Sequence, residues 1–237
     1  MINVCRTTVL VLCLLLPSIP FTAATADRDK DKEASVSSQE PDADIRWLQK
    51  RLRQRGYLFA KATGVYDKET RFAVWALRKS HGMRPANVVD AAVLRKLDQP
   101  GKIRPLVKGG AANRVEIDLG RQLLTVYRRN KPVLISHAST GAGVRFCQGG
   151  RCRKAITPVG DFRVYKRAGG WTKGPLGSMY NSLYFVGGVA MHGSRKVPSW
   201  PGSHGCVRLP MSVADRLWKI VGIGEPVHVR KGRKLHG

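Results

Sequence analysis

The pattern of apolar and polar residues changes its period once along the chain. In residues 42–98, apolar residues recur at intervals of three and four, which is the period of an amphipathic helix. Asp67 and Asp90 stand where helix N-caps are expected, and Gly56 and Gly82 stand where helices end. This segment is therefore predicted to form a small all-α domain of three helices.

After a linker at 99–112 that is rich in glycine and proline, apolar and polar residues alternate, as they do in strands with one buried face. Only the segment 212–221 returns to helical spacing. Residues 113–231 are therefore predicted to form a mainly β domain with a few helices. Strands are expected at 115–119, 124–126, 133–135, 162–165, 183–186 and 226–229.

The N-terminal segment has the order of a secretory signal peptide. Arg6 precedes the apolar run Val9–Leu16, and the small residues Ala24–Ala26 follow at a cleavage position. The run is too short to span a membrane comfortably, so we expect a secreted protein of the periplasm or cell wall without a stable transmembrane anchor. The ends of the chain are assigned accordingly: a signal peptide at 1–26, a disordered spacer at 27–41 and a basic tail at 232–237.

The chain is strongly basic, with a formal net charge of +26 that becomes +25 when the signal peptide and its one arginine leave. Such a charge favours an anionic partner. Nucleic acid does not suit an exported protein that lacks a nucleic-acid-binding module. Anionic cell-wall polymers or a membrane surface fit the predicted compartment better, and solubility alone is the alternative explanation.

Three of the five cysteines remain after the signal peptide is removed: Cys147, Cys152 and Cys206. Gly149 and Gly150 permit a sharp turn between the first two, which favours a disulfide that closes a tight loop. That pairing leaves Cys206 as the odd thiol. Three cysteines allow three pairings, so the arithmetic does not decide among them.

Cys206 is the best candidate for a nucleophile, because a thiol becomes reactive when a nearby imidazole takes its proton. His204 is two residues away and points to the opposite face of an extended segment, whereas His192 arrives from a separate strand and can face the thiol. The N–H groups of Gly205 and Cys206 are candidate donors for an oxyanion hole. The competing interpretation is that Cys206 is a small buried apolar residue.

Other side chains near this segment are candidates for substrate binding. Arg208 suits a planar carboxylate, although a structural hydrogen bond would explain it equally well. Tyr180 and Tyr184 are candidates for a donor pocket, but aromatic residues between strands more often belong to the core. Trp200 lies among glycine and proline and is a candidate for the edge of a lid.

A metal site is the third interpretation of the same residues. The spacing of His192, His204 and Cys206 matches none of the usual zinc patterns, so we expect neither a metal nor another cofactor.

The run Ser203-His204-Gly205-Cys206-Val207-Arg208, preceded by Met191-His192-Gly193, resembles the signature of the L,D-transpeptidase catalytic domain, also called the YkuD domain. The likeness covers about 113–230 and implies a YkuD-like β-sandwich with a few helices. The helical region is similar to the three-helix peptidoglycan-binding domain. Both resemblances point to the same polymer, although Arg53, Arg55, Lys61 and Arg71 would make the surface of the helical domain unusually basic.

The resemblance implies a reaction and a set of roles. The cysteine attacks the third residue of a peptidoglycan stem peptide, a diamino acid, and releases the terminal D-alanine. The amine of a second stem then attacks the thioester, which gives a 3→3 cross-link. By this resemblance Cys206 is the nucleophile, His192 the base and later the acid, Gly205 and Cys206 the oxyanion donors, and Ser203, His204 and the Gly193 backbone order the site. Carbapenems acylate this family, and the same is expected here.

Two alternatives stay open. An L,D-carboxypeptidase would use the same acyl-enzyme and hydrolyse it. A non-catalytic cell-wall-binding protein would depend on charge and the helical domain alone. Only ten residues separate His192 from Ser203, which is short for the family and puts the substrate preference in doubt.

Overall fold

The computed structural model describes residues 42–99, 103–232 and 235. The predicted signal peptide at 1–26, the spacer at 27–41 and most of the basic tail lie outside these residues. No helix in the described ranges is both long and apolar enough to cross a membrane.

Three helices form the N-terminal part, as the apolar spacing predicts. They are α1 (Ala43–Gln54), α2 (Lys68–Ser80) and α3 (Ala91–Asp98). In each, an aspartate caps the N-terminus by accepting backbone N–H groups; the caps of α2 and α3 are Asp67 and Asp90. The three helices bury a shared core that includes Leu52, Leu77 and Leu97.

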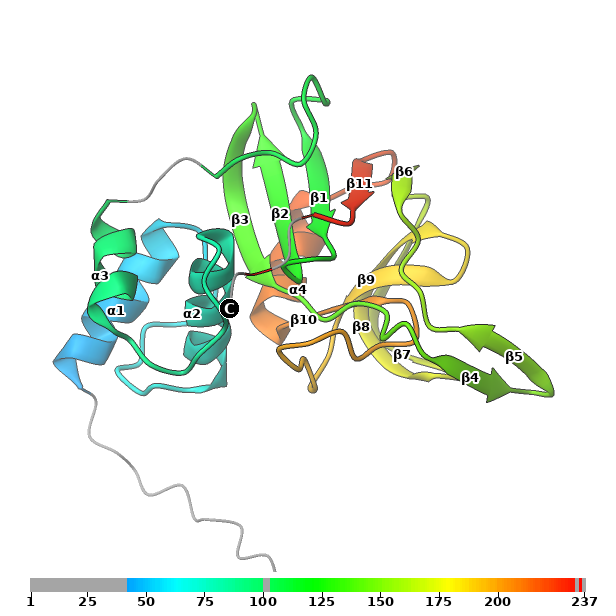
Figure 1. Ribbon diagram of the computed structural model, residues 1–237, viewed down its shortest axis with the longest axis horizontal. Helices are drawn as coiled ribbons and strands as arrows, with labels where there is room; N and C mark the ends of the chain where they lie inside the picture. The colour runs from blue at the N-terminus through cyan, green and yellow to red at the C-terminus, as the bar shows by residue number, and fades with distance from the viewer. Residues whose placement is uncertain (1–41, 100–102, 233–234, 236–237) are drawn as a thin grey trace, which may run out of the picture. The chain divides into compact units, whose positions relative to one another are not determined.

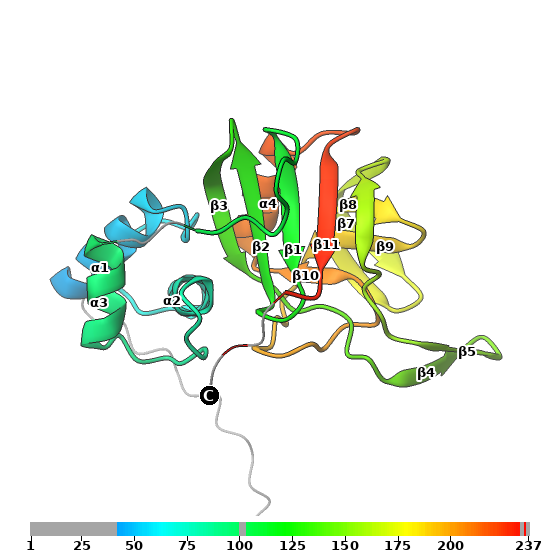
Figure 2. The ribbon, with the colours of Figure 1, turned by 45° about the horizontal axis from the view of Figure 1, so that its top comes forward.

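Two β-sheets form the framework of the rest of the described chain (Figures 1 and 2), which confirms a mainly β domain with a few helices. The first sheet has the order β3-β2-β1-β11-β6, and the second has the order β10-β9-β8-β7. The first consists of β1 (Arg114–Asp118), β2 (Leu123–Arg128), β3 (Lys131–His137), β6 (Gly160–Arg163) and β11 (Pro226–Arg230). The second consists of β7 (Lys166–Gly174), β8 (Gly177–Val186), β9 (Val189–Gly193) and β10 (Val207–Leu209).

One apolar core joins the two sheets. It contains Ile117 and Leu124 from the first sheet and Leu183 and Met191 from the second, all fully buried. Helix α4 (Met211–Ile220) packs on β8 and β9 and adds Leu217 to this core. The inward residues alternate along the strands, so the residues between them remain on the outer face of the second sheet.

A third, two-stranded sheet is the hairpin of β4 (Arg145–Gln148) and β5 (Arg151–Lys154). It pairs with neither large sheet and projects from the domain in both ribbon views (Figures 1 and 2). A disulfide joins Cys147 to Cys152 across the two strands.

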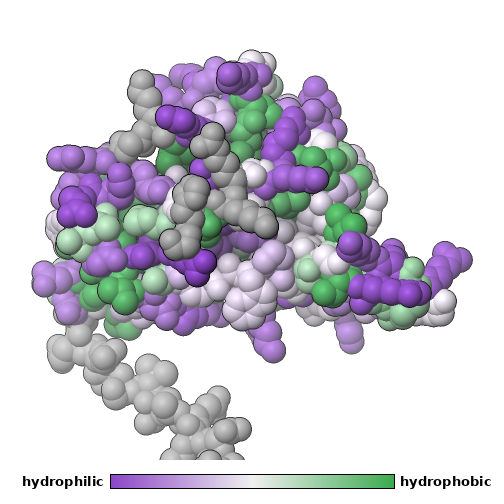
Figure 3. Space-filling view, in the orientation of Figure 1, coloured by the Kyte–Doolittle hydropathy of each residue, from purple (hydrophilic) through white to green (hydrophobic). Residues whose placement is uncertain are grey.

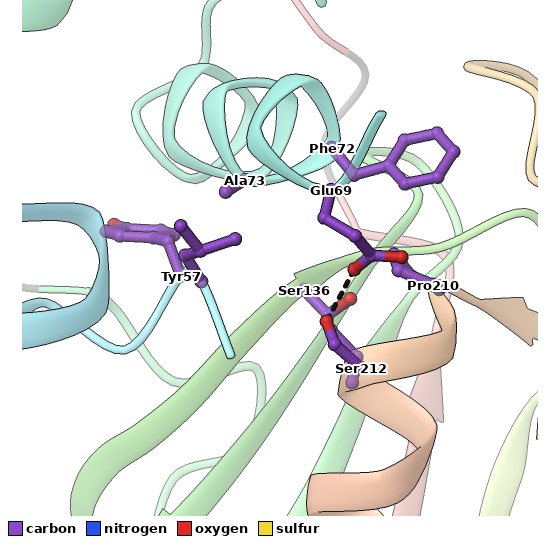
Figure 4. Close-up of a pocket in the computed structure, with 9 residues that line it drawn as sticks. Tyr57, Glu69, Phe72, Ala73, Ser136, Pro210 and Ser212 are labelled. Carbon is purple, nitrogen blue, oxygen red and sulfur yellow. Dashed lines mark hydrogen bonds between the residues drawn. The ribbon is translucent and has the colours of Figure 1, made fainter. Parts of the chain in front are cut away.

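Helix α2 packs on β3 and thereby joins the helices to the β domain. Leu123 and Ile135 of the β domain belong to the same apolar cluster as the helical core. At the edge of this contact, Ser212 at the start of α4 donates a hydrogen bond to the Glu69 carboxylate (Figure 4). Burial raises the pKa of Glu69, although the Ser212 hydroxyl partly offsets this effect.

The linker expected at 99–112 is held in place where the structure describes it. Ile103 packs against the helical core, and the Leu106 N–H donates to the buried Glu116 carboxylate at 2.7 Å. This carboxylate also pairs with Arg114 at 2.7 Å.

Candidate active site

His192 and Cys206 lie on neighbouring parallel strands. His192 is in β9, Cys206 directly precedes β10, and the register pairs His192 with Arg208. Met191 and Val207 point into the core, so alternation places His192, Cys206 and Arg208 on the opposite face. Two chain segments 14 residues apart thereby present the thiol and the imidazole on one surface.

The His192 ring is fixed by its neighbours. Its Nδ1 lies 2.9 Å from the Gly193 carbonyl oxygen, and this carbonyl can only accept a hydrogen bond, so Nδ1 carries the proton. The other nitrogen, Nε2, is then the basic one. A side chain at Gly193 would not fit, because a Cβ there would lie 2.9 Å from the Ala214 Cβ and 3.1 Å from the Tyr180 ring.

Burial lowers the pKa of His192 to about 4, with a further lowering from the Arg208 charge; the Gly193 carbonyl acts in the opposite direction. The imidazole is therefore neutral at pH 7. A neutral imidazole is the form that can accept a proton from a thiol.

Burial also raises the pKa of the Cys206 thiol, against smaller opposing effects of the Ala190 backbone N–H and the Arg208 charge. Within the described residues, Cys206 Sγ hydrogen-bonds to the Gly188 carbonyl oxygen at 3.8 Å and not to His192. Cys206 itself is only partly exposed. The resting site thus holds a neutral thiol and a neutral imidazole rather than an ion pair.

The turn before Cys206 is closed by Ser203. The Ser203 hydroxyl donates to the Cys206 carbonyl oxygen at 2.5 Å and accepts from the Gly205 N–H at 3.0 Å. Gly205 has a φ of 138°, and a Cβ there would lie 2.9 Å from the Ile156 carbonyl oxygen. The Gly205 N–H, expected as an oxyanion donor, is therefore engaged in this structure and becomes available only if the hydroxyl turns away.

His204 is exposed and stacks on Phe146 of β4, with ring centroids 4.7 Å apart. It lies against the projecting hairpin, and no hydrogen bond of its side chain is found among the described residues. The structure therefore shows no hydrogen bond through which the His204 side chain would order the site among the described residues.

The substrate-binding candidates are divided between two faces of the second sheet. Tyr184 pairs with Ala190 and so shares the face of His192, whereas Tyr180 pairs with Gly193, lies toward α4 and stacks on Trp171 at 5.2 Å. Trp200 is 64% exposed, and the Ser139 hydroxyl donates a hydrogen bond to the Trp200 carbonyl oxygen at 2.8 Å. Arg208 is partly buried, and within the described ranges its guanidinium forms no salt bridge.

The loop between His192 and Cys206 has anchors that the sequence did not reveal. Lys79 of α2 donates to the Ser199 carbonyl oxygen at 3.2 Å and contacts His137 Nδ1 at 2.8 Å. His137 Nε2 in turn lies 3.2 Å from the Val197 carbonyl oxygen. No local pattern in the sequence marks the pairing of His137 with Lys79, which is 58 residues away.

Comparisons with known proteins give a consistent result. Residues 112–229 match the L,D-transpeptidase catalytic domain family, YkuD, and residues 41–97 match the putative peptidoglycan binding domain family. A crystal structure of an L,D-transpeptidase from Xylanimonas cellulosilytica is 37% identical with a TM-score of 0.73, covering 79% of this chain and 93% of that one.

A second crystal structure, of an L,D-transpeptidase from Stackebrandtia nassauensis, is 23% identical with a TM-score of 0.48, covering 81% of this chain and 93% of that one. Of these two structures, the one from Xylanimonas supports the family assignment. A search among curated proteins found no match.

Proposed function

Because the chain belongs to the L,D-transpeptidase family, we propose that it forms 3→3 peptidoglycan cross-links through a thioester at Cys206. The observation that carries this proposal is that His192 in β9 and Cys206, directly before β10, lie on the same face of two neighbouring parallel strands. The peptidoglycan-binding domain supports the same polymer as partner.

In the first half-reaction, His192 Nε2 takes the Cys206 proton while the sulfur attacks the carbonyl carbon of the third stem residue, a diamino acid. The carbonyl oxygen becomes an oxyanion, for which the N–H groups of Cys206 and, after Ser203 turns away, Gly205 are the proposed donors. The C–N bond to the terminal D-alanine then breaks, and His192 returns the proton to the leaving amine. A thioester at Cys206 remains.

In the second half-reaction, the side-chain amine of another stem attacks the thioester carbonyl. His192 accepts a proton from this amine, and the C–S bond breaks. The proton then goes to the sulfur, which restores the neutral pair. Because the resting thiol and imidazole are both neutral, proton transfer would accompany substrate attack rather than precede it.

The site works outside the cytoplasmic membrane in this proposal, which is where a secreted protein would meet the polymer. The high positive charge would also favour anionic wall polymers as secondary partners. Covalent catalysis and hydrogen bonds suffice for the reaction, so no cofactor is part of the proposal.

Mass spectrometry of the intact protein tests the nucleophile. Incubation with a stem tetrapeptide, or with meropenem, should give an adduct on the unaltered protein and none on Cys206→Ala. His192→Gln should form the adduct at least about 100-fold more slowly, since it removes the general base. An adduct on Cys206→Ala would show that the nucleophile is elsewhere.

The products separate the proposed reaction from its alternatives. Cross-linked dimers support transpeptidation, whereas trimmed tripeptide alone would make the protein an L,D-carboxypeptidase. If Cys206→Ala keeps every cellular effect of the protein, the wall-binding alternative holds instead.

A further inference from the structure

The β4–β5 hairpin is a projecting arm that is hydrogen-bonded at its base to the loop that carries Cys206. At its base, the Ala142 N–H donates to the Ser203 carbonyl oxygen at 2.9 Å. On the other side of the base, the Thr157 hydroxyl donates to the Gly205 carbonyl oxygen at 2.6 Å. A displacement of the hairpin base would therefore move the backbone that presents Cys206.

The arm also contacts the hairpin formed by β7 and β8. The Gln148 side chain donates to the Pro175 carbonyl oxygen, in the turn between β7 and β8, at 2.6 Å. Strands β7 and β8 carry Trp171 and Tyr180, which stack beside Gly193. The Cys147–Cys152 disulfide closes the arm between these contacts.

The arm carries positive charge without a counter-charge. Four exposed basic residues lie within ten residues that contain no acid: Arg145, Arg151, Arg153 and Lys154. Between Leu119 and Ala214 the only acidic residue is Asp161, which is already paired with His228 and Arg230. Hydrophilic residues gather along the projecting end of the molecule in the space-filling view (Figure 3).

The strand register divides the four charges between two faces. Arg153 pairs with Phe146 and Arg151 pairs with Gln148, so both arginines share the face that contacts His204 and Pro175. Arg145 and Lys154 pair with each other and share the disulfide face. The two guanidinium groups therefore lie on the side of the arm that faces the nucleophile's loop.

We propose that Arg151 and Arg153 bind a carboxylate of the stem peptide and so set the preference of the enzyme for acidic over amidated stems. This inference rests on the proposed function. Guanidinium groups bind planar carboxylates through paired hydrogen bonds. The attachment of the arm to the loop of Cys206 favours a substrate peptide over a phosphate-rich wall polymer, which would not need to be held beside the nucleophile.

The test is a binding experiment that does not need catalysis. Cys206→Ala protein is titrated by calorimetry with two synthetic stem tetrapeptides, one with free side-chain carboxylates and one with the same carboxylates amidated. The double variant Arg151→Gln/Arg153→Gln should weaken binding of the acidic peptide about five- to tenfold and leave binding of the amidated peptide unchanged.

The matched control lies on the same hairpin. Arg145→Gln/Lys154→Gln removes the same charge from the opposite face, and it should change the affinity for the acidic peptide less than about twofold in 0.15 M salt. If both double variants lose the same affinity for the acidic peptide, the effect is due to net charge alone and the proposal is overturned. Failure of the acidic peptide to bind, or equal binding of both peptides by the protein without the arginine substitutions, would overturn it as well.

Two further measurements separate this inference from the proposed function. If Cys206 forms no acyl-enzyme while the acidic peptide still binds selectively, the proposed reaction is wrong, but the role of the arm in peptide binding stands. If the acyl-enzyme forms at equal rates on both peptides in every variant, the reaction stands and the arm has no role in selectivity. Binding of inorganic polyphosphate at the arm, with no preference among peptides, would assign it to a wall polymer instead.

Discussion

Lys79 should make the stability of the protein rise with pH. A lysine in a salt bridge has the opposite effect, because its pKa is raised in the folded state. The Lys79 side chain is fully buried, and its ammonium group contacts His137 Nδ1 and the carbonyl oxygens of Gln122 and Ser199. No carboxylate pairs with it among the described residues. Burial accordingly lowers the pKa of Lys79 to about 7 from 10.5.

The direction of this pH dependence follows from proton binding by Lys79 in the folded and unfolded chains. Between pH 7 and pH 10.5 the unfolded chain holds the Lys79 proton more tightly than the folded chain, so the free energy of unfolding rises with pH. Each pKa unit corresponds to about 1.4 kcal/mol, so the rise from pH 7 to pH 10 should amount to about 3–4 kcal/mol. Below pH 7 the full penalty is present, and above pH 10.5 it has disappeared.

Lys79→Met isolates this contribution. Methionine has a similar length and no charge, so the pH-dependent rise should vanish. At pH 7 the variant is stabilised because it no longer buries a charged ammonium group. It is also destabilised by about 1–3 kcal/mol, because the Ser199 and Gln122 carbonyl oxygens and His137 Nδ1 lose their donor. The free energy of unfolding at a single pH is therefore a poor test. Its change with pH is a good one.

The assay is urea unfolding followed by tryptophan fluorescence from pH 7 to pH 10. Both proteins carry Cys206→Ala, so that neither thiol titration nor disulfide exchange contributes. Parallel stability curves would refute the reasoning, because they would mean that Lys79 keeps an ordinary pKa in the folded state. In the protein with Cys206 intact, Lys79→Met should also lower kcat/KM, since Ser199 lies in the loop between the two catalytic candidates.

Three further predictions follow from the site and the helices. Gly193→Ala should cost about 1–3 kcal/mol of stability and displace His192, because its Cβ would lie 2.9 Å from the Ala214 Cβ, whereas Gly222→Ala, with open space around it, should be tolerated in urea unfolding. Alkylation of resting Cys206 by iodoacetamide should accelerate through a midpoint above the ordinary pKa of a cysteine thiol, because burial raises the pKa of Cys206; a plateau already reached at pH 7 would indicate a preformed ion pair. Asp67→Ala should lower thermal stability by about 1 kcal/mol through loss of the α2 N-cap, and Asp67→Asn should restore most of it.

The helices and most strands that face the apolar core could be predicted from the sequence because their signals are local. Asp67 and Asp90 precede α2 and α3 as N-caps, and the expected segment 212–221 nearly coincides with α4 at Met211–Ile220. Such signals depend on hydrogen bonds and burial within a few residues of each other.

Five strands lie outside the ranges expected from the sequence. His192 was expected on a strand, but the bounds of β9 were not given, and the other four strands were missed for physical reasons. Strands β4 and β5 are exposed and carry arginine in place of an alternating apolar set. Strand β7 is largely exposed and contains three glycines, and β10 has only three residues. A strand that buries little apolar surface leaves little periodicity in the sequence.

Within the site, the sequence motif identified the candidates but not their hydrogen bonds. Ser203 engages the Gly205 N–H, and His204 stacks on Phe146, which lies 58 residues earlier in the chain. Contacts such as these depend on the packing of distant segments, and neither hydrophobic period nor spacing records them.

The neutral resting state of Cys206 and His192 fits the compartment proposed for the enzyme. Outside the cytoplasm a free thiol is exposed to oxidants, and oxidation proceeds through the thiolate. Burial raises the pKa of Cys206 and so keeps the thiolate scarce until a substrate arrives. Cys147 and Cys152 are already paired with each other on the adjacent hairpin, so the chain offers Cys206 no free cysteine partner among the described residues. An enzyme with a preformed thiolate–imidazolium pair would react faster with small electrophiles, but it would also lose its nucleophile faster. The neutral state of both groups therefore favours the lifetime of the nucleophile in the proposed compartment over intrinsic thiol reactivity, and the substrate itself must supply the interactions that draw the proton to His192.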